Sequence, residues 1–217
     1  MSAAEFVLFV LGAAVAGAAF GAGIGAPLAT RVARDERRAR GWRHPAAGAA
    51  VGALAFAAVA AATGFAPMLM PALAFAATAT VLTMTDAAER RIPHVVLGPA
   101  LAIVAGLLVV ATLLDGEPER LLGALLGALA YFVLLFLIAL AAPRGMGMGD
   151  VKLALLTGMI LGSGGVTAWL VGVVAATVFG GIVAVGALAL RRVDLSGSVP
   201  FGPAMLAGAI AGLAVAA

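Results

Sequence analysis

Residues 121–142 read LLGALLGALAYFVLLFLIALAA, a run that contains no charged side chain. A helix needs about 20 apolar residues of this kind to cross the hydrocarbon core of a bilayer. Further apolar runs lie on both sides of it, at 4–28, 46–65, 67–85, 95–114, 151–162, 166–190 and 203–217. The sequence therefore predicts an all-α fold, a polytopic integral membrane helical bundle of about eight transmembrane helices.

The composition of the whole chain supports a membrane protein. Hydrophobic residues make up 64% of the chain and charged residues only 11%, whereas a soluble domain carries about 25% charged residues. Alanine and glycine are frequent in the apolar runs, which allows membrane helices to approach closely. The chain contains no cysteine, so disulfides, thiolate zinc sites and thiol catalysis are excluded.

The basic residues fall almost entirely on one side if all of the predicted spans cross the membrane. That side receives Arg31, Arg34, Arg37, Arg38, Arg40, Arg43, Arg90, Arg91, Arg144, Lys152, Arg191 and Arg192, and only Arg120 falls on the other. The positive-inside rule makes the basic side cytoplasmic, with both termini outside. Residues 1–217 are predicted to form a single membrane-embedded domain, with 29–45 as a basic cytoplasmic loop that anchors the topology and meets anionic lipid headgroups.

Two aspartates, Asp86 and Asp150, stand at the ends of apolar runs and on the predicted cytoplasmic side. A carboxylate near hydrocarbon is costly and usually functional, although a helix-capping role is the alternative for each. Gly145, Gly147 and Gly149 alternate just before Asp150. Such a loop is expected to adopt positive φ and to leave room for an extended substrate. Two carboxyls on one membrane face suggest aspartyl chemistry, here peptide hydrolysis.

These residues carry a family resemblance. Residues 147–150 read GMGD and match the GxGD signature of membrane aspartyl proteases, and the longer string 147–153, GMGDVKL, resembles the prepilin peptidase version. Asp86 followed by the RIP string at 91–93 resembles the other aspartate motif of that family. His94 stands where the family usually has asparagine.

Two further segments extend the resemblance over nearly the whole chain. Residues 199–203 read VPFGP and resemble the PFGP segment that opens the last helix of the family. The glycine-rich end of the first span, residues 21–28, is similar to the first helix of the family. The order and spacing of the motifs identify the chain as similar to type IV prepilin leader peptidases.

The resemblance implies a membrane aspartic endopeptidase with Asp86 and Asp150 as the catalytic pair and no cofactor or metal. Its substrate would be a type IV pilin-like precursor, cut after a glycine at the cytoplasmic face of the bacterial inner membrane. Lys152 and Arg91 could tune the pair or bind the substrate, or could only anchor the chain at lipid headgroups. Pro93 and His94 are expected to form a turn near the site.

One departure from the family narrows the resemblance to a short form. Large members carry a cytosolic domain with paired CxxC zinc motifs after the first helix and also N-methylate the mature pilin. This chain has only residues 30–45 at that position and no cysteine. A tetrathiolate zinc site is therefore impossible, and N-methyltransferase activity stays an open question.

Other readings remain at this stage. A presenilin-like or signal-peptide-peptidase-like protease shares GxGD but expects a tyrosine before the partner aspartate, where this chain has Thr85. A proton-coupled transporter would favour carboxylates near the middle of the bilayer. A non-catalytic membrane assembly protein would need neither aspartate. The sequence leaves open the identity of the pilin, the oligomeric state and which aspartate is initially ionised.

Overall fold

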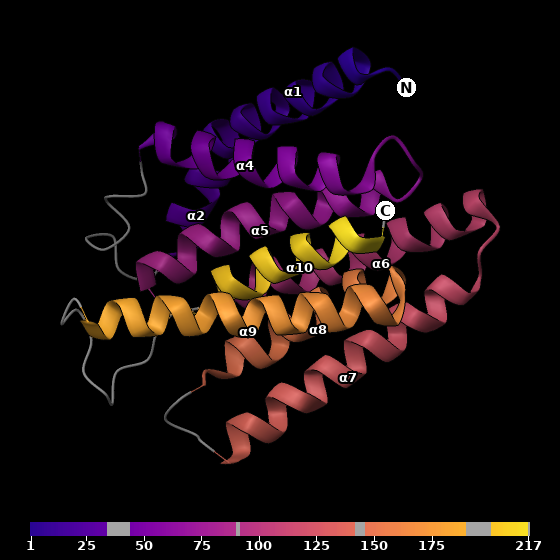
Figure 1. The fold of residues 1–217 in the computed structure, drawn as a ribbon. Coiled ribbons are helices and arrows are strands. Elements are labelled where there is room, and N and C mark those ends of the chain that lie inside the picture. The colour runs from indigo at the N-terminus through magenta and orange to yellow at the C-terminus, as the bar shows by residue number, and fades with distance from the viewer. Residues whose placement is uncertain (34–43, 90–91, 142–145, 190–200, 217) are drawn as a thin grey trace.

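The computed structural model in Figure 1 describes residues 1–33, 44–89, 92–141, 146–189 and 201–216. These residues form helices and no strand, which confirms the all-α membrane fold. In chain order the elements are α1 (Ala3–Phe20), the π-helical turn η1 (Gly21–Gly25), α2 (Ala26–Val32), α4 (Pro45–Thr63), α5 (Leu69–Glu89), α6 (His94–Asp115), α7 (Glu119–Ala141), α8 (Met148–Ser163), α9 (Gly165–Ala189) and α10 (Gly202–Ala216).

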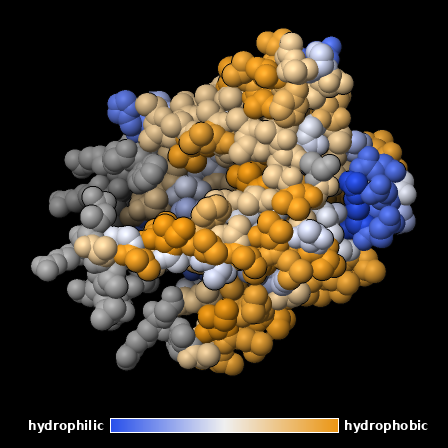
Figure 2. Space-filling model, in the orientation of Figure 1, coloured by the Kyte–Doolittle hydropathy of each residue, from blue (hydrophilic) through white to orange (hydrophobic). Residues whose placement is uncertain are grey.

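Six of the described segments are long and apolar enough to cross a membrane. The first is continuous from Ala3 to Val32, and the others are α4, α5, α6, α7 and the part of α9 up to Gly186. Hydrophobic residues cover much of the face seen in Figure 2, while a strongly hydrophilic cluster lies at one end of the molecule. An apolar exterior of this kind is what a lipid environment requires.

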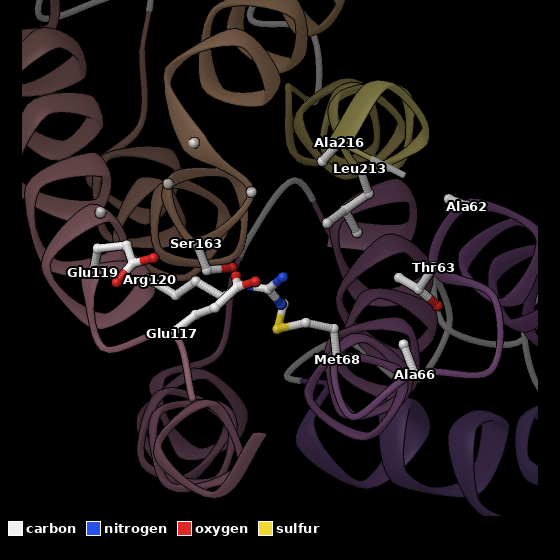
Figure 3. A pocket seen from close by; sticks show the side chains of 14 residues that line it. Ala62, Thr63, Ala66, Met68, Glu117, Glu119, Arg120, Ser163, Leu213 and Ala216 are labelled. Carbon is white, nitrogen blue, oxygen red and sulfur yellow. The ribbon is translucent and has the colours of Figure 1, made fainter. Parts of the chain in front are cut away.

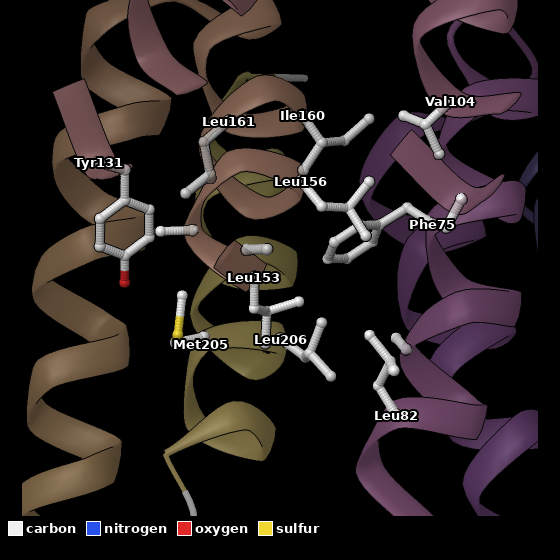
Figure 4. Close-up of a cluster of buried hydrophobic side chains, with 14 of the residues drawn as sticks. Phe75, Leu82, Val104, Tyr131, Leu153, Leu156, Ile160, Leu161, Met205 and Leu206 are labelled. Carbon is white, nitrogen blue, oxygen red and sulfur yellow. The ribbon is translucent and has the colours of Figure 1, made fainter. Parts of the chain in front are cut away.

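The predicted spans 151–162 and 203–217 correspond to two shorter helices, α8 and α10, of 16 and 15 residues. Both present many buried residues, because α8 packs against α7 and α10 packs against α9, with further contacts between α8 and α10. Figure 4 shows Leu156 of α8 beside Phe75 of α5, and Leu153 of α8 near Met205 and Leu206 of α10, all within one buried cluster. These helices form the interior of the bundle.

Successive spans run in opposite directions, with α1, η1 and α2 forming one continuous span, so their ends gather at two ends of the bundle (Figure 1). At one end, the α4–α5, α6–α7 and α8–α9 connections and the last turn of α10 line a common pocket of about 510 Å³ (Figure 3). Arg120 lies there and forms ion pairs with Asp115 at 3.1 Å and Glu117 at 2.5 Å. The opposite end corresponds to the predicted basic side. Of the arginines predicted there, only Arg31 belongs to the described residues.

Glycine pairs set the close approach of α7 and α8. A Cβ atom added to Gly127 would lie 2.5 Å from the Gly158 carbonyl oxygen, and one added to Gly123 would lie 2.5 Å from the Gly162 carbonyl oxygen. The pairing 127 with 158 and 123 with 162 is the register of two antiparallel helices. Small residues therefore allow backbone-to-backbone packing, and this contact fixes the depth at which α8 sits in the bundle.

We expect Gly158→Ala to lower the free energy of unfolding by about 1–3 kcal/mol, the usual cost of overpacking. The added Cβ would lie 2.9 Å from the Gly127 carbonyl carbon and 3.0 Å from the Ala128 Cα, and neither backbone atom can move away cheaply. Thermal unfolding in detergent, followed by Trp169 fluorescence in a Trp42→Phe background, measures the effect. Trp169 reports on this contact because its Nε1 donates to the Gly127 carbonyl oxygen at 3.0 Å.

Gly106→Ala is the matched control, because a Cβ there would have no heavy atom within 4 Å. It should leave the melting temperature unchanged or raise it, since alanine favours a helix over glycine. Equal melting temperatures for the two variants would contradict the role of glycine in the contact between α7 and α8.

Candidate active site

Asp86 lies in the last turn of α5 and is buried, with only 4% of its surface exposed. Helix α5 continues past it to Glu89, so the carboxyl is held by a rigid element. The preceding residue, Thr85, donates its hydroxyl hydrogen to the carbonyls of Val81 and Leu82 within the same helix. An acid that only caps a helix can stay exposed at the lipid headgroups. Asp86 is instead buried against protein, so capping alone does not explain its position.

Asp150 lies in the first turn of α8, ahead of the apolar part of that helix, and is half-buried. Gly147 is the residue that precedes the helix, and its carbonyl accepts a hydrogen bond from the Asp150 amide at 3.1 Å. The end of α5 and the start of α8 meet at the same end of the bundle, so the prediction that Asp86 and Asp150 share one face agrees with the structure.

The expected conformation of the glycine loop is wrong for the two described glycines. Gly147 has φ −79° and ψ 145°, and Gly149 belongs to helix α8. Among the described glycines, positive φ occurs only at Gly64, Gly116 and Gly165. Helix α8 begins earlier than the sequence suggested, at Met148, because glycine can adopt helical φ and ψ even though it favours a helix less than alanine does. Gly145 lies outside the described residues.

Gly149 serves a close contact instead. A Cβ atom there would lie 3.2 Å from the Cβ and 3.5 Å from the Cγ1 of Ile92. Ile92 is 4% exposed and precedes Pro93, the residue from which α6 starts. The contact therefore joins the segment after Asp86 to the first turn of α8. Arg91, the neighbouring basic residue, lies outside the described residues.

The electrostatics of Asp150 indicate that the two carboxyls interact. Burial raises the pKa of Asp150, the negative charge of Asp86 raises it further, and a hydrogen bond with the Gly147 backbone lowers it, with a result of about 7. An acid with such a pKa is half protonated at neutral pH. A neighbouring carboxylate has this effect only when the groups are close, so α5 and α8 bring the two acids together.

Lys152 and His94, predicted separately, are brought together at the same end of the bundle as the aspartates. The Lys152 Nζ lies 3.4 Å from the His94 Nε2, which joins α8 to the first turn of α6. His94 is exposed, and Lys152 is partly buried. Pro93 is the N-cap of α6, with its carbonyl accepting from the amides of Val96 and Leu97 at 3.1 Å. The predicted turn at Pro93 and His94 is thus the start of a helix.

Two residues near the aspartates were given no role at the site from the sequence, although Gly202 belongs to the PFGP segment quoted above. The amide of Gly202, the first residue of α10, donates to the Asp86 Oδ2 at 3.2 Å. Tyr131 of α7, 1% exposed, lies close enough to Asp150 for the two to interact electrostatically. Tyr131 could have been noticed from the sequence, because it is the only tyrosine of the chain and lies within a long apolar run. The contact of Gly202 could not be inferred from its residue type.

The pocket in Figure 3 lies at the other end of the bundle and contains neither aspartate. The two ends of the bundle are therefore chemically distinct, and the aspartate end is the candidate active site. Within the described ranges, no group of three or more His, Asp or Glu side chains converges as metal ligands do. What this end offers is a pair of interacting carboxyls on two rigid helices.

Comparison with protein-family models gives a match to the type IV leader peptidase family over residues 73–185. Comparison with curated proteins and with solved structures found no match. The matched range runs from within α5 into α9 and contains Asp86, Ile92, Gly149 and Asp150. Because it covers more than half of the chain, this multi-pass membrane protein belongs to the type IV leader peptidase family.

Proposed function

We propose that this protein is an aspartic endopeptidase that removes the leader peptide from type IV pilin-like precursors at the cytoplasmic face of the bacterial inner membrane. The observation that carries the proposal is the placement of Asp86 in the last turn of α5 and of Asp150 in the first turn of α8, at one end of the bundle and within the range matched by the leader peptidase family. Burial and the charge of Asp86 raise the pKa of Asp150, as expected for neighbouring carboxyls. Two carboxyls that share a proton are the working parts of an aspartyl protease.

The proposed mechanism divides the work between the two acids. Asp86, in its ionised form, removes a proton from a water molecule, whose oxygen attacks the carbonyl carbon of the scissile bond. Asp150, with its pKa raised to about 7, holds a proton that it donates to the carbonyl oxygen. The tetrahedral intermediate then collapses: Asp150 takes back the proton from one hydroxyl as the carbonyl re-forms, the C–N bond breaks, and the proton on Asp86 passes to the leaving nitrogen. Both acids thereby return to their starting protonation states.

The position of the acids supports a cut at the membrane surface. Both lie where helices end. Asp86 is buried, but Asp150 is only half-buried and gives water access to the pair, while the apolar sides of the bundle face lipid. A precursor whose basic leader stays in the cytoplasm and whose next segment enters the bilayer as a helix would place its junction at this level. Cleavage after a glycine is what the family resemblance implies.

The rival readings are less well supported. A proton-coupled transporter would place its acids near the middle of the membrane, whereas Asp86 and Asp150 lie at one end of the bundle. A presenilin-like protease expects tyrosine before the aspartate on the partner helix, and the residue before Asp86 is Thr85. A non-catalytic assembly protein gives no reason for two interacting carboxyls.

Co-expression with a candidate pilin-like precursor tests the function directly. Removal of the leader shifts the precursor to lower mass on a gel, and mass spectrometry of the product gives the cleavage site. Cleavage that follows a glycine and requires this protein supports the proposal. A panel of precursors that all remain uncut, with the protein folded in the membrane, would refute it.

We also expect the aspartate end to face the cytoplasm. Cysteines introduced at Ala87 in α5 and at Glu119 in α7 are suitable probes, because both positions are exposed and the chain has no native cysteine. Position 119 is preferable to Gly116, whose φ of +71° disfavours a side chain. A membrane-impermeant thiol reagent should label position 119 in intact spheroplasts and position 87 only after lysis. The reverse pattern would overturn the orientation.

A further inference from the structure

Helix α10 begins directly against Asp86. Its first residue, Gly202, is buried, and its amide donates to the Asp86 Oδ2 at 3.2 Å. The first amides of a helix have no hydrogen-bond partner within the helix. The hydrogen bond to Asp86 therefore pairs the amide of Gly202, which the helix itself leaves unpaired. A bond from an N–H to a carboxylate is charge-assisted and stronger than one between neutral groups.

The start of α10 is held in place by its own packing. The Met205 amide donates to the Phe201 carbonyl at 3.0 Å, which fixes the first turn. Met205, with no exposed surface, and Leu206, 3% exposed, lie in the buried cluster beside Leu153 of α8 (Figure 4). The donor is therefore presented to Asp86 from a rigid element, which is the arrangement that orients a side chain accurately.

The absence of a Cβ atom at Gly202 leaves the space that the Asp86 carboxyl occupies. A Cβ atom there would lie 2.7 Å from the Asp86 Oδ2 and 3.4 Å from its Cγ. The atoms in the way belong to the end of the aspartate side chain and not to a backbone. A substitution at Gly202 would therefore displace the carboxyl rather than the helix, and a residue with a Cβ is incompatible with the observed contact.

We propose that Gly202 is a positioning residue of the peptidase: its amide, delivered by the start of α10, fixes the orientation in which the Asp86 carboxylate takes the proton from water. The inference rests on the proposed function and extends it to a third helix. Residue 202 lies outside the matched range 73–185, so the family match does not assign it this role.

The sharpest test removes the N–H without adding an atom to the side chain. Cell-free synthesis with glycolate in place of Gly202 replaces the amide by an ester, which cannot donate. We expect kcat for the cleavage of a pilin-like precursor to fall about 10- to 100-fold, the range for loss of a hydrogen bond to a charged group, with KM within about twofold. Gly202→Ala, which displaces the carboxyl, should lower kcat at least as much.

The matched control is lactate in place of Ala207, which lies on the exposed side of the same helix. It also replaces one amide of α10 by an ester, but far from Asp86, and should leave kcat close to that of the unmodified enzyme. A general weakening of α10 would lower the melting temperature and affect both esters, whereas the positioning role predicts a loss of kcat for position 202 alone.

An infrared measurement provides a readout that needs no substrate. Subtracting the spectrum of the Asp86→Asn variant isolates the carboxylate stretch of Asp86, and glycolate at position 202 should shift that band. An unshifted band, or a shifted band with unchanged kcat, overturns the positioning role of Gly202. The proposed function would still stand in that case if the unmodified enzyme cleaves the precursor and the Asp86 and Asp150 variants do not. If the unmodified enzyme cleaves no precursor, the proposed function fails and the positioning role fails with it.

Discussion

Asp86→Asn and Asp150→Asn are each expected to reduce the rate of leader cleavage to background, a loss of about 10²- to 10⁴-fold for removal of one general acid or base. Asparagine has nearly the shape of aspartate but neither accepts nor supplies the proton that the reaction moves. Asp86 is buried, and Asp150 is held in the first turn of α8, so no solvent carboxylate can take their place. Quantified gel shifts of a co-expressed precursor measure the rate.

The controls must separate lost chemistry from lost folding. Each asparagine variant should accumulate in the membrane at the wild-type level and should keep the wild-type melting temperature within a few degrees. Glu89→Gln, at the last residue of α5, removes a carboxyl from the same helix and should cleave at close to the wild-type rate. A rate close to wild type for either aspartate variant would rule out the two-carboxyl mechanism.

Gly149→Val is expected to reduce cleavage about a hundredfold, which is the scale of loss when a reacting group is misplaced by about 1 Å. The Cβ alone would lie 3.2 Å from the Cβ of Ile92, and the two γ-methyl groups of valine would add to that crowding. The first turn of α8 would have to move away from Ile92, and Asp150, the next residue, would move with it. Single-turnover cleavage rates measure the loss.

Met148→Leu is the matched comparison in the same turn of α8. Met148 is 52% exposed, so its replacement by leucine, which has a similar volume, should leave cleavage nearly unchanged. Both variants should be assayed at equal levels of folded protein. If Gly149→Val were as active as Met148→Leu, the contact with Ile92 would have no part in positioning Asp150.

The apolar runs predicted the helices closely, because a bilayer imposes its thickness on every segment that crosses it. The run at 95–114 corresponds to α6 (His94–Asp115), and the run at 121–142 to α7 (Glu119–Ala141). The aspartates could be selected in the same way, since a carboxyl next to an apolar run is costly wherever it lies. The family resemblance implied a turn at Pro93 and His94, where the structure has the N-cap and the first residue of α6.

The glycines near Asp150 were misinterpreted for a physical reason. Glycine is compatible with a turn, a strand, a helix and a close contact, so its presence does not tell which of these applies. The sequence suggested positive φ and an open path for substrate, whereas Gly149 lies in α8 and faces Ile92. The choice depends on a neighbour 57 positions earlier in the chain, which local sequence does not specify.

The sequence by itself determined that this chain is a bundle of apolar helices with two acids on one side, because hydrophobicity and charge act on each segment separately. Only the tertiary structure decided that α8 and α10 lie in the interior, that Asp86 accepts a hydrogen bond from the amide of Gly202, and that its charge raises the pKa of Asp150. These relations depend on how closely helices approach, and that distance is set by pairs of small residues such as Gly127 and Gly158. Packing between distant segments is a property of the pair, so neither segment encodes it alone.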